Sequence, residues 1–297
     1  MANRSSHRPY LLLSMLLVIV AVGCVAAINL IVDPYGMYGF VFKRGLNQIK
    51  PHAGANGVMA KAYQVQRARP STLILGNSRA EVGFNPLSAS WPPTLHPVYN
   101  AALPGAYPIT SLRYLQHVIF VQKPTVVVLG VDFVDYLIRE DAESDRAAMG
   151  QAVEERRLLV TYEGTPNPIY RQQRAADIAA SVMSLDAFIH SINTLASQSR
   201  LDAQDLTPQG FNPMRDYAGI ARREGYEIMF RQRDEENARA YARRPKSIYR
   251  AGTATSSQLD ILRSMIAVCR EQEITLHMVI YPYHAHLLET FHAVALW

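Results

Sequence analysis

The segment Tyr10–Val32 constrains the fold most strongly, because its 23 residues are almost continuously apolar. A helix needs about 20 such residues to cross the hydrocarbon core of a bilayer. The nine residues before it carry basic side chains and no acid, which favours a cytoplasmic amino end. We therefore predict a cytoplasmic tail over 1–9, a transmembrane helix over 10–32, and the rest of the chain outside the cytoplasm.

Two other interpretations of this segment remain open. A cleaved signal peptide usually has a shorter apolar core, and no clear small-x-small cleavage site follows the segment. Ala21-Val-Gly-Cys24 weakly resembles a lipoprotein box, in which Cys24 would be acylated, although apolar sequence continues past the cysteine. We favour an uncleaved signal anchor over both.

Three short apolar runs further along the chain show no polar alternation. They are Leu73–Leu75, Val126–Leu129 and Leu276–Ile280. Such runs are typical of strands buried on both faces of a parallel sheet. Because predicted helices lie between these runs along the chain, we predict that the runs are adjacent parallel strands of one α/β sheet.

The elements around these runs complete the predicted fold, a three-layer sandwich with helices on both faces of a parallel sheet. Pro97–Gly105 predicts a short strand that closes in a Pro-Gly turn, and Ile274–Tyr281 predicts another buried strand. The predicted helices are Val58–Arg69, Ile109–Val121, Ser256–Gln272 and Leu287–Trp297.

The segment from Arg139 to Arg250 has a different character, since it carries 17 basic and 17 acidic residues. We predict one helix over Gln172–Ala196 and a solvated helical surface over Arg222–Arg250, and we interpret the segment as a scaffold without chemistry. The predicted division is a linker over 33–56, an α/β part over 57–138, a helical insertion over 139–250 and a second α/β part over 251–297.

Composition excludes several classes of function. The net charge of +5 is spread along the chain, with no basic stripe and interleaved aromatics of the kind that nucleic-acid binding needs. The two cysteines, Cys24 and Cys269, lie in different predicted helices, so we expect no disulfide between them. The nine histidines are scattered apart from His284 and His286, so we predict neither a metal site nor a cofactor.

A serine follows the first of the apolar runs. In Gly76-Asn77-Ser78-Arg79, the glycine permits a sharp turn and the serine stands at the carboxyl end of the strand. Ligands of α/β sheets usually bind at that edge. The alternative is a turn whose Asn77 and Ser78 only cap the next segment.

Three short motifs together resemble the SGNH-hydrolase superfamily, in particular its membrane-anchored bacterial branch linked to polysaccharide or cell-envelope modification. These motifs are Gly76-Asn-Ser78, Asn100 with Leu103-Pro-Gly105, and Gly130-Val-Asp132. The resemblance covers roughly residues 70–135 and 255–286. It implies that Ser78 is the nucleophile and that Asn100, the Gly105 amide and Asp132 surround an oxyanion or the substrate. Arg79 would contact an anionic substrate.

The chain departs from the superfamily at several positions. Asn77 stands where an acid is usual, the spacing from Ser78 to Gly83 is one residue longer, and Asp132 replaces an amide donor. The Asp-x-x-His block near the carboxyl end is missing, because Tyr281 and Tyr283 stand three residues before His284 and His286. We expect the chain to be a truncated version of a longer enzyme.

A serine hydroxyl needs a base to become a nucleophile, and His284 is the first candidate, with His286 the second. The resemblance implies a serine esterase or O-acyltransferase at the inner (cytoplasmic) membrane, acting on a glycan or an acylated carrier. The alternatives are a non-catalytic, membrane-tethered binding or assembly protein and a plain lipoprotein.

Overall fold

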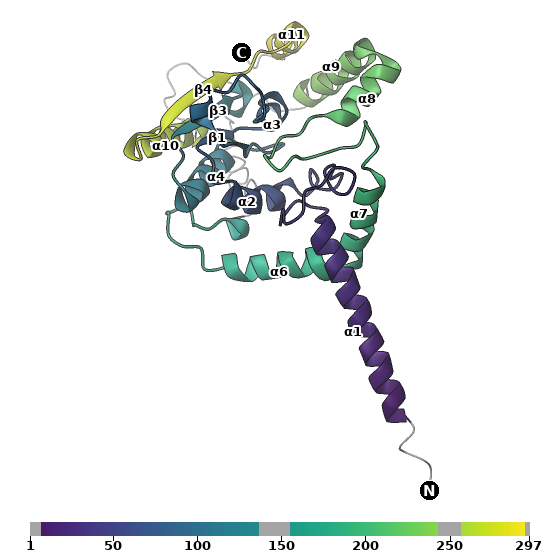
Figure 1. The fold of residues 1–297 in the computed structure, drawn as a ribbon. Helices are drawn as coiled ribbons and strands as arrows, with labels where there is room; N and C mark the ends of the chain where they lie inside the picture. Colours follow the sequence, from purple (N-terminus) through teal and green to yellow (C-terminus); the bar gives the residue numbers. More distant parts are fainter. Residues whose placement is uncertain (1–6, 137–154, 243–256, 295–297) are drawn as a thin grey trace.

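A computed structural model of the 297-residue chain describes residues 7–136, 155–242 and 257–294. The first helix, α1 (His7–Val32), stands out from the rest of the chain (Figure 1). Its side chains are exposed from Arg8 to Cys24. The helix is long and apolar enough to span a membrane, as the sequence predicts.

Four parallel strands form the sheet: β1 (Thr72–Leu75), β2 (Val98–Asn100), β3 (Val126–Val131) and β4 (Thr275–Ile280). Their order is β2-β1-β3-β4, and Val127 of β3 pairs with Leu73 of β1 and with Leu276 of β4. The three apolar runs are therefore adjacent and parallel, which confirms that prediction.

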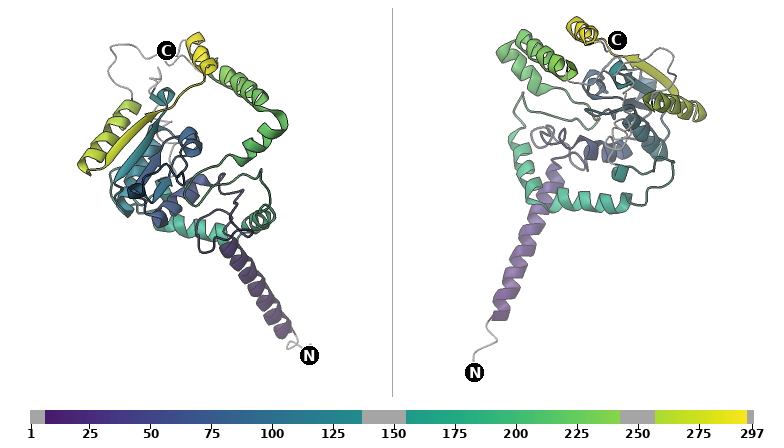
Figure 2. Two further views of the ribbon diagram at one scale, coloured as in Figure 1. Left: turned by 45° about the horizontal axis from the view of Figure 1, so that its top comes forward. Right: turned by 180° about the vertical axis from the view of Figure 1, so that it is seen from behind.

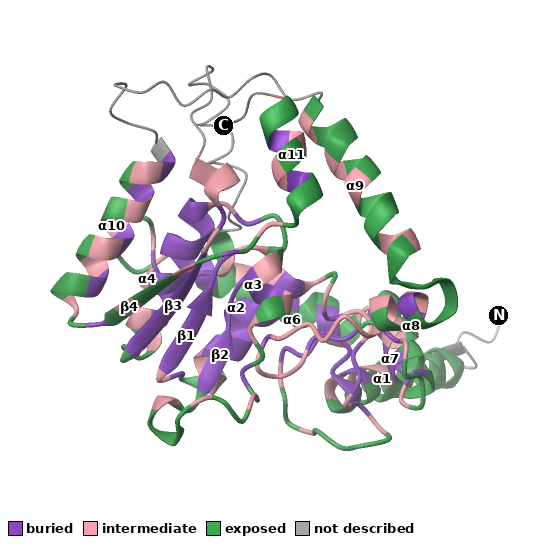
Figure 3. Cartoon of the chain, turned by 90° about the horizontal axis from the view of Figure 1, so that it is seen from above, coloured by how far each residue is buried: buried purple, intermediate pink, exposed green. Residues whose placement is uncertain are grey.

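Helices cover both faces of the sheet. On one face, α2 (Gly57–Ala68), α4 (Pro108–Val121) and α10 (Ser257–Glu271) pack on an apolar core that contains Leu73 and Val127. On the other face, α3 (Ser78–Gly83) and the loop after it cover Ile74 and Val128. Figure 3 shows β1, β2 and β3 as buried, whereas β4 at the edge of the sheet is largely exposed.

The edge strand β4 is more exposed than the sequence predicts. The sequence Ile274–Tyr281 predicts a buried strand, yet the side chains of Met278 and Ile280 are 51% and 72% exposed. The reason is position, since no strand within the described ranges pairs with the outer edge of β4. An apolar run reports hydrophobicity, which does not distinguish a central strand from an edge strand.

The helix predicted over Gln172–Ala196 is two helices, α6 (Tyr170–Met183) and α7 (Leu185–Ala196), which meet at an angle of 59°. Ser184 makes the break, because its backbone is extended and its hydroxyl accepts the N–H of Ala187. Serine is a preferred N-cap, and a cap starts a new helix. We call this corner the α6–α7 elbow.

Asn29, the polar exception in the apolar segment, joins α1 to the α6–α7 elbow. Its Nδ2 donates to the carbonyl oxygens of Val182 and Ser184 at 2.9 and 3.3 Å. Its Oδ1 accepts the hydroxyl of Ser191 at 2.9 Å. A buried amide with three hydrogen bonds is well satisfied, so the elbow and the end of α1 form one unit.

Helices from the insertion and from the end of the chain lie side by side. After α8 (Arg215–Glu224), helix α9 (Tyr226–Ala242) packs against α11 (Ala285–Ala293), as Figures 1 and 2 show. Phe291 of α11 contacts Tyr241 and Phe133 edge to face. The last helix begins at Ala285, two residues before the predicted start at Leu287. The parts of the predicted insertion over 139–154 and 243–250, and the predicted helix end over 295–297, lie outside the described residues.

The start of the insertion is fixed to the core by the buried His117 of α4. Its Nε2 donates to the carbonyl of Ala62 in α2, and its Nδ1 accepts the N–H of Leu159, both at 3.0 Å. The ring must be neutral to make both bonds. Burial lowers the pKa of His117 to about 4, although the hydrogen bond to Ala62 opposes the shift.

We predict that His117 makes the folded chain less stable in acid. Between the ordinary pKa of 6.5 and about 4, the unfolded chain binds a proton at His117 and the folded chain does not. Stability should therefore fall as the pH drops through this window, by about 3 kcal/mol in total. Denaturant unfolding of the detergent-solubilised chain between pH 4 and 7 measures it. His117→Gln keeps a donor and an acceptor but cannot titrate, so it should remove the loss of stability between pH 6.5 and about 4. An unchanged pH dependence of stability in this variant would contradict the assignment of that loss to His117.

Candidate functional site

A cleft of about 620 Å³ lies at the carboxyl edge of the sheet. Its walls come from the segment after β1, the turn after β2, helices α8 and α9, and the segment after β4. Its lining includes Ser78, Arg79, Glu81, Pro104, Asp205, Phe230, Asp234, Tyr283 and His284. The insertion therefore contributes to the cleft, although its sequence alone predicts a scaffold without chemistry.

Ser78 is the first residue of α3, and its side chain is exposed at the end of β1. Gly76, with φ of 141°, makes the turn that places it there. A Cβ at Gly76 would lie 2.7 Å from the Tyr281 hydroxyl, so no other residue fits. The Ser78 hydroxyl makes no hydrogen bond with any residue that the structure describes.

The polar residues beside Ser78 are engaged with one another. Asn77 accepts the N–H of Arg79 at 3.0 Å, and its Nδ2 donates to Asp132 at 3.1 Å. Arg79 Nε lies 3.5 Å from the same Asp132 oxygen, and the guanidinium stacks on the Tyr283 ring at 4.2 Å. Asp132 thus accepts a hydrogen bond from Asn77 and forms an ion pair with Arg79 through one carboxylate oxygen, and it is not part of the cleft lining.

Asn100 has a structural role in this arrangement. Its Nδ2 donates to the carbonyl oxygens of Ala80 and Phe84, and its Oδ1 accepts the N–H of Ala102. The side chain is fully buried and ties β2 to α3. Gly105 lies exposed in the turn beside Pro104 and is likewise outside the cleft lining. Of the predicted site residues, the cleft brings together Ser78, Arg79 and His284, whereas His286, the second candidate base, is not among its lining residues.

His284 caps the start of α11, since its Nδ1 accepts the backbone N–H of His286 at 3.3 Å. Its ring stacks on Phe230 of α9, with 5.6 Å between centroids. A neutral His284 that accepts at Nδ1 carries its proton on Nε2. In this state Nε2 donates, and no hydrogen bond joins the ring to Ser78 among the described residues.

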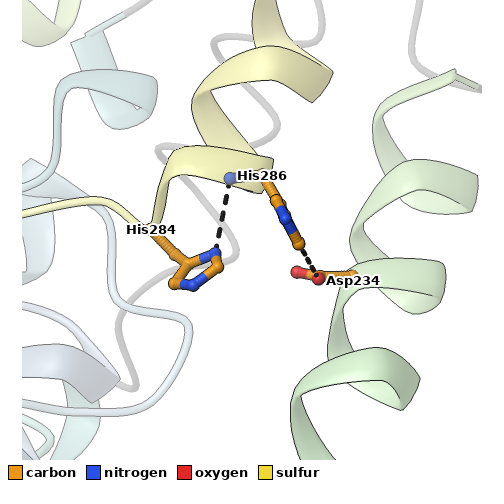
Figure 4. Close-up of side chains that lie close together, drawn as sticks. All are labelled: Asp234, His284 and His286. Carbon is orange, nitrogen blue, oxygen red and sulfur yellow. Dashed lines mark hydrogen bonds and ion pairs between the residues drawn. The ribbon is translucent and has the colours of Figure 1, made fainter. Parts of the chain in front are cut away.

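In His286, by contrast with His284, Nδ1 faces a carboxylate and not a backbone N–H (Figure 4). Its Nδ1 lies 2.8 Å from an oxygen of Asp234 in α9. A carboxylate at Nδ1 holds the proton there and leaves Nε2 free to accept one. Asp234 does not follow from the sequence motif, because the motif places an acid three residues before the histidine. Nothing in the local sequence distinguishes Asp234 from Glu235 and Glu236.

The same three residues have the composition of a metal site. One ligand atom each from Asp234, His284 and His286 lie within 4.8 Å of one another. Two imidazoles and a carboxylate suit a divalent transition metal such as Zn²⁺. The sequence showed only the histidine pair, because the carboxylate comes from a helix far away along the chain.

Other carboxylates of the cleft already have partners. Burial raises the pKa of Asp205, although the N–H of Lys50 donates to it and Arg215 lies 3.5 Å away. Glu81 pairs with the buried Lys61 at 2.8 Å. These charges hold the walls together and are not available to a ligand.

Comparison of the chain with family models, with curated proteins and with solved structures gave no match. The candidate site therefore depends on the sequence motifs and on the geometry of the cleft.

We predict that Asn100 acts on stability. Asn100→Ala removes two donors from buried carbonyl groups and should cost about 1–3 kcal/mol, measured by denaturant unfolding. The control is Asn85→Ala, an exposed asparagine that accepts one N–H, from Leu87, and it should cost less. A stable Asn100→Ala protein in which Ser78 loses all reactivity would instead place Asn100 in the chemistry.

Proposed function

We propose that the chain is a membrane-anchored serine esterase or O-acyltransferase of the SGNH-hydrolase type, acting on a glycan or another cell-envelope substrate. The observation that carries the proposal is the exposed Ser78 hydroxyl, which lines a cleft at the carboxyl edge of the sheet together with His284 and Asp234. The proposal includes the three-layer sandwich of that superfamily. It also includes an anchor in the inner (cytoplasmic) membrane, with the cleft outside the cytoplasm.

The proposed chemistry transfers an acyl group through Ser78. Nε2 of His286 takes the hydroxyl proton while Ser78 attacks the acyl carbonyl, and Asp234 holds the ring and stabilises its charged form. The bond to the leaving alcohol breaks, and that alcohol takes the proton from His286. Water, or a hydroxyl group of a second substrate, then attacks the Ser78 ester in the same manner.

The mechanism places requirements on both sides of the cleft. His286 is not among the lining residues of the cleft, so its ring must come within about 2.6–3.2 Å of the Ser78 hydroxyl when substrate is bound. His284 is the second candidate for this role, and it would first have to release the N–H of His286. Backbone amides of Ser78 and of Gly105, in the exposed turn, are the proposed oxyanion donors, since Asp132 already accepts from Asn77.

A non-catalytic binding or assembly protein is the second candidate function. Two observations favour it: the Ser78 hydroxyl is bonded to no described residue, and Arg79 is already paired with Asp132. A binding protein would use the cleft without forming a covalent intermediate. The two functions therefore differ in the reactivity of Ser78.

We predict that a fluorophosphonate probe labels Ser78 in the detergent-solubilised chain. Such probes react with serine hydroxyls that a neighbouring base activates. Ser78→Ala should abolish labelling and hydrolysis of an activated ester. Ser90→Ala, which removes another exposed serine, should leave both intact. Absence of labelling in the unaltered chain would favour the binding function.

We predict that His286→Ala lowers kcat for ester hydrolysis by about 10²–10⁴-fold, which is the usual contribution of a general base. Asp234→Asn should lower kcat less, with little change in KM, because Asp234 acts through the ring. His292→Ala, an exposed histidine on the same helix, is the matched control. Loss of activity on treatment with EDTA would show that the cluster works as a metal site instead.

A further inference from the structure

The α6–α7 elbow presents an apolar surface that no described residue covers. The side chains of Met183, Leu185 and Ile189 are 60%, 71% and 53% exposed. Ile178 and Ile192 extend the surface along the two helices. We call these five residues the elbow face.

The opposite sides of both helices are held by the rest of the chain. In α6, Asp177 accepts hydrogen bonds from Arg157 and from the hydroxyl of Tyr63. In α7, the side chains of Ala187 and Ser191 are buried. Each helix is therefore amphipathic, with its polar and small residues inward and the elbow face outward.

The length of the free part of α1 shows where a membrane would end. From Tyr10 to Cys24, the exposed stretch of the helix is about 22 Å long at 1.5 Å per residue. The hydrocarbon core of a bilayer is about 30 Å thick and takes about 20 helical residues. A bilayer that contains α1 must therefore reach the level of Asn29, to which the elbow is bonded.

The arrangement of the helices agrees with a bilayer that reaches the level of Asn29. In all views α6 and α7 lie at the end of the domain from which α1 emerges (Figures 1 and 2). Both helices contact α1 directly. Ile28 and Ile31 of α1, at the level of the elbow, are 37% and 49% exposed. The elbow face and the apolar surface of α1 are thus neighbouring parts of one apolar region.

We propose that the elbow face is a second membrane contact, which lies in the boundary between lipid headgroups and acyl chains. Amphipathic helices bind there by burying an apolar face about 5–10 Å deep. The inference rests on the proposed function in one respect, that α1 spans a bilayer. A spanning helix alone leaves the domain free to rotate and tilt, whereas a second contact fixes its orientation.

Spin labels on the full chain in lipid nanodiscs of phosphatidylethanolamine and phosphatidylglycerol test the proposal. Single cysteines are placed by Leu185→Cys, Ile280→Cys and Ile19→Cys in a Cys24→Ser background, in which Cys269 is buried. Leu185 and Ile280 are matched, since they are 71% and 72% exposed. The measurement is the ratio of collisions with oxygen, which enters lipid, to collisions with a water-soluble nickel chelate.

The ratio should be several-fold higher at Leu185 than at Ile280 and should approach that of Ile19. Equal ratios at Leu185 and Ile280, with a high ratio at Ile19, would overturn the membrane contact and leave the anchor in place. A low ratio at Ile19 as well would overturn the anchor itself. Shielding of Leu185 from both reagents, with dipolar broadening between labels, would mean that a second copy of the chain covers the elbow face and would also overturn the proposal.

Discussion

The close approach of Tyr281 to two glycines holds the carboxyl edge of the sheet together. A Cβ at Gly130 would lie 1.7 Å from the Tyr281 hydroxyl, and one at Gly76 would lie 2.7 Å from it. Only glycine at both positions lets the ring lie across the ends of β1 and β3. The segment after Tyr281 consequently turns over these strand ends, and His284 comes to line the same cleft as Ser78.

Much of the fold could be predicted from the sequence, because its signals are local. The unalternating run Val126–Leu129 indicates a strand of a parallel sheet wherever the neighbours lie, and Tyr10–Val32 indicates a helix by length alone. The exposure of β4 was not predictable, since it depends on what pairs with the edge. The corner at Ser184 was missed for another reason: a single capping residue outweighs continuous apolar spacing.

The candidate site was predictable only in part. Ser78 lies at a strand end because Gly76 ends the strand, and both signals are visible in the sequence. The structural role of Asn100 was not predictable from the sequence, because the same amide group can either bind a ligand or join two backbone segments. Asp234 depends on the packing of α9 against α11, and no local pattern reports a contact between segments so far apart.

With α1 as the proposed membrane anchor, the distance between α1 and the cleft limits how the proposed substrate can arrive. Helix α1 leaves the domain at one end, whereas α9 and α11, which line the cleft, stand at the opposite end (Figure 1). In the proposed orientation, a lipid whose reactive group stays at the membrane surface would not reach Ser78. Under the proposed function, this arrangement would select molecules that project well beyond the headgroups, such as a long polysaccharide still attached to its carrier. The thickness of the domain would then set how far along such a chain the proposed reaction takes place.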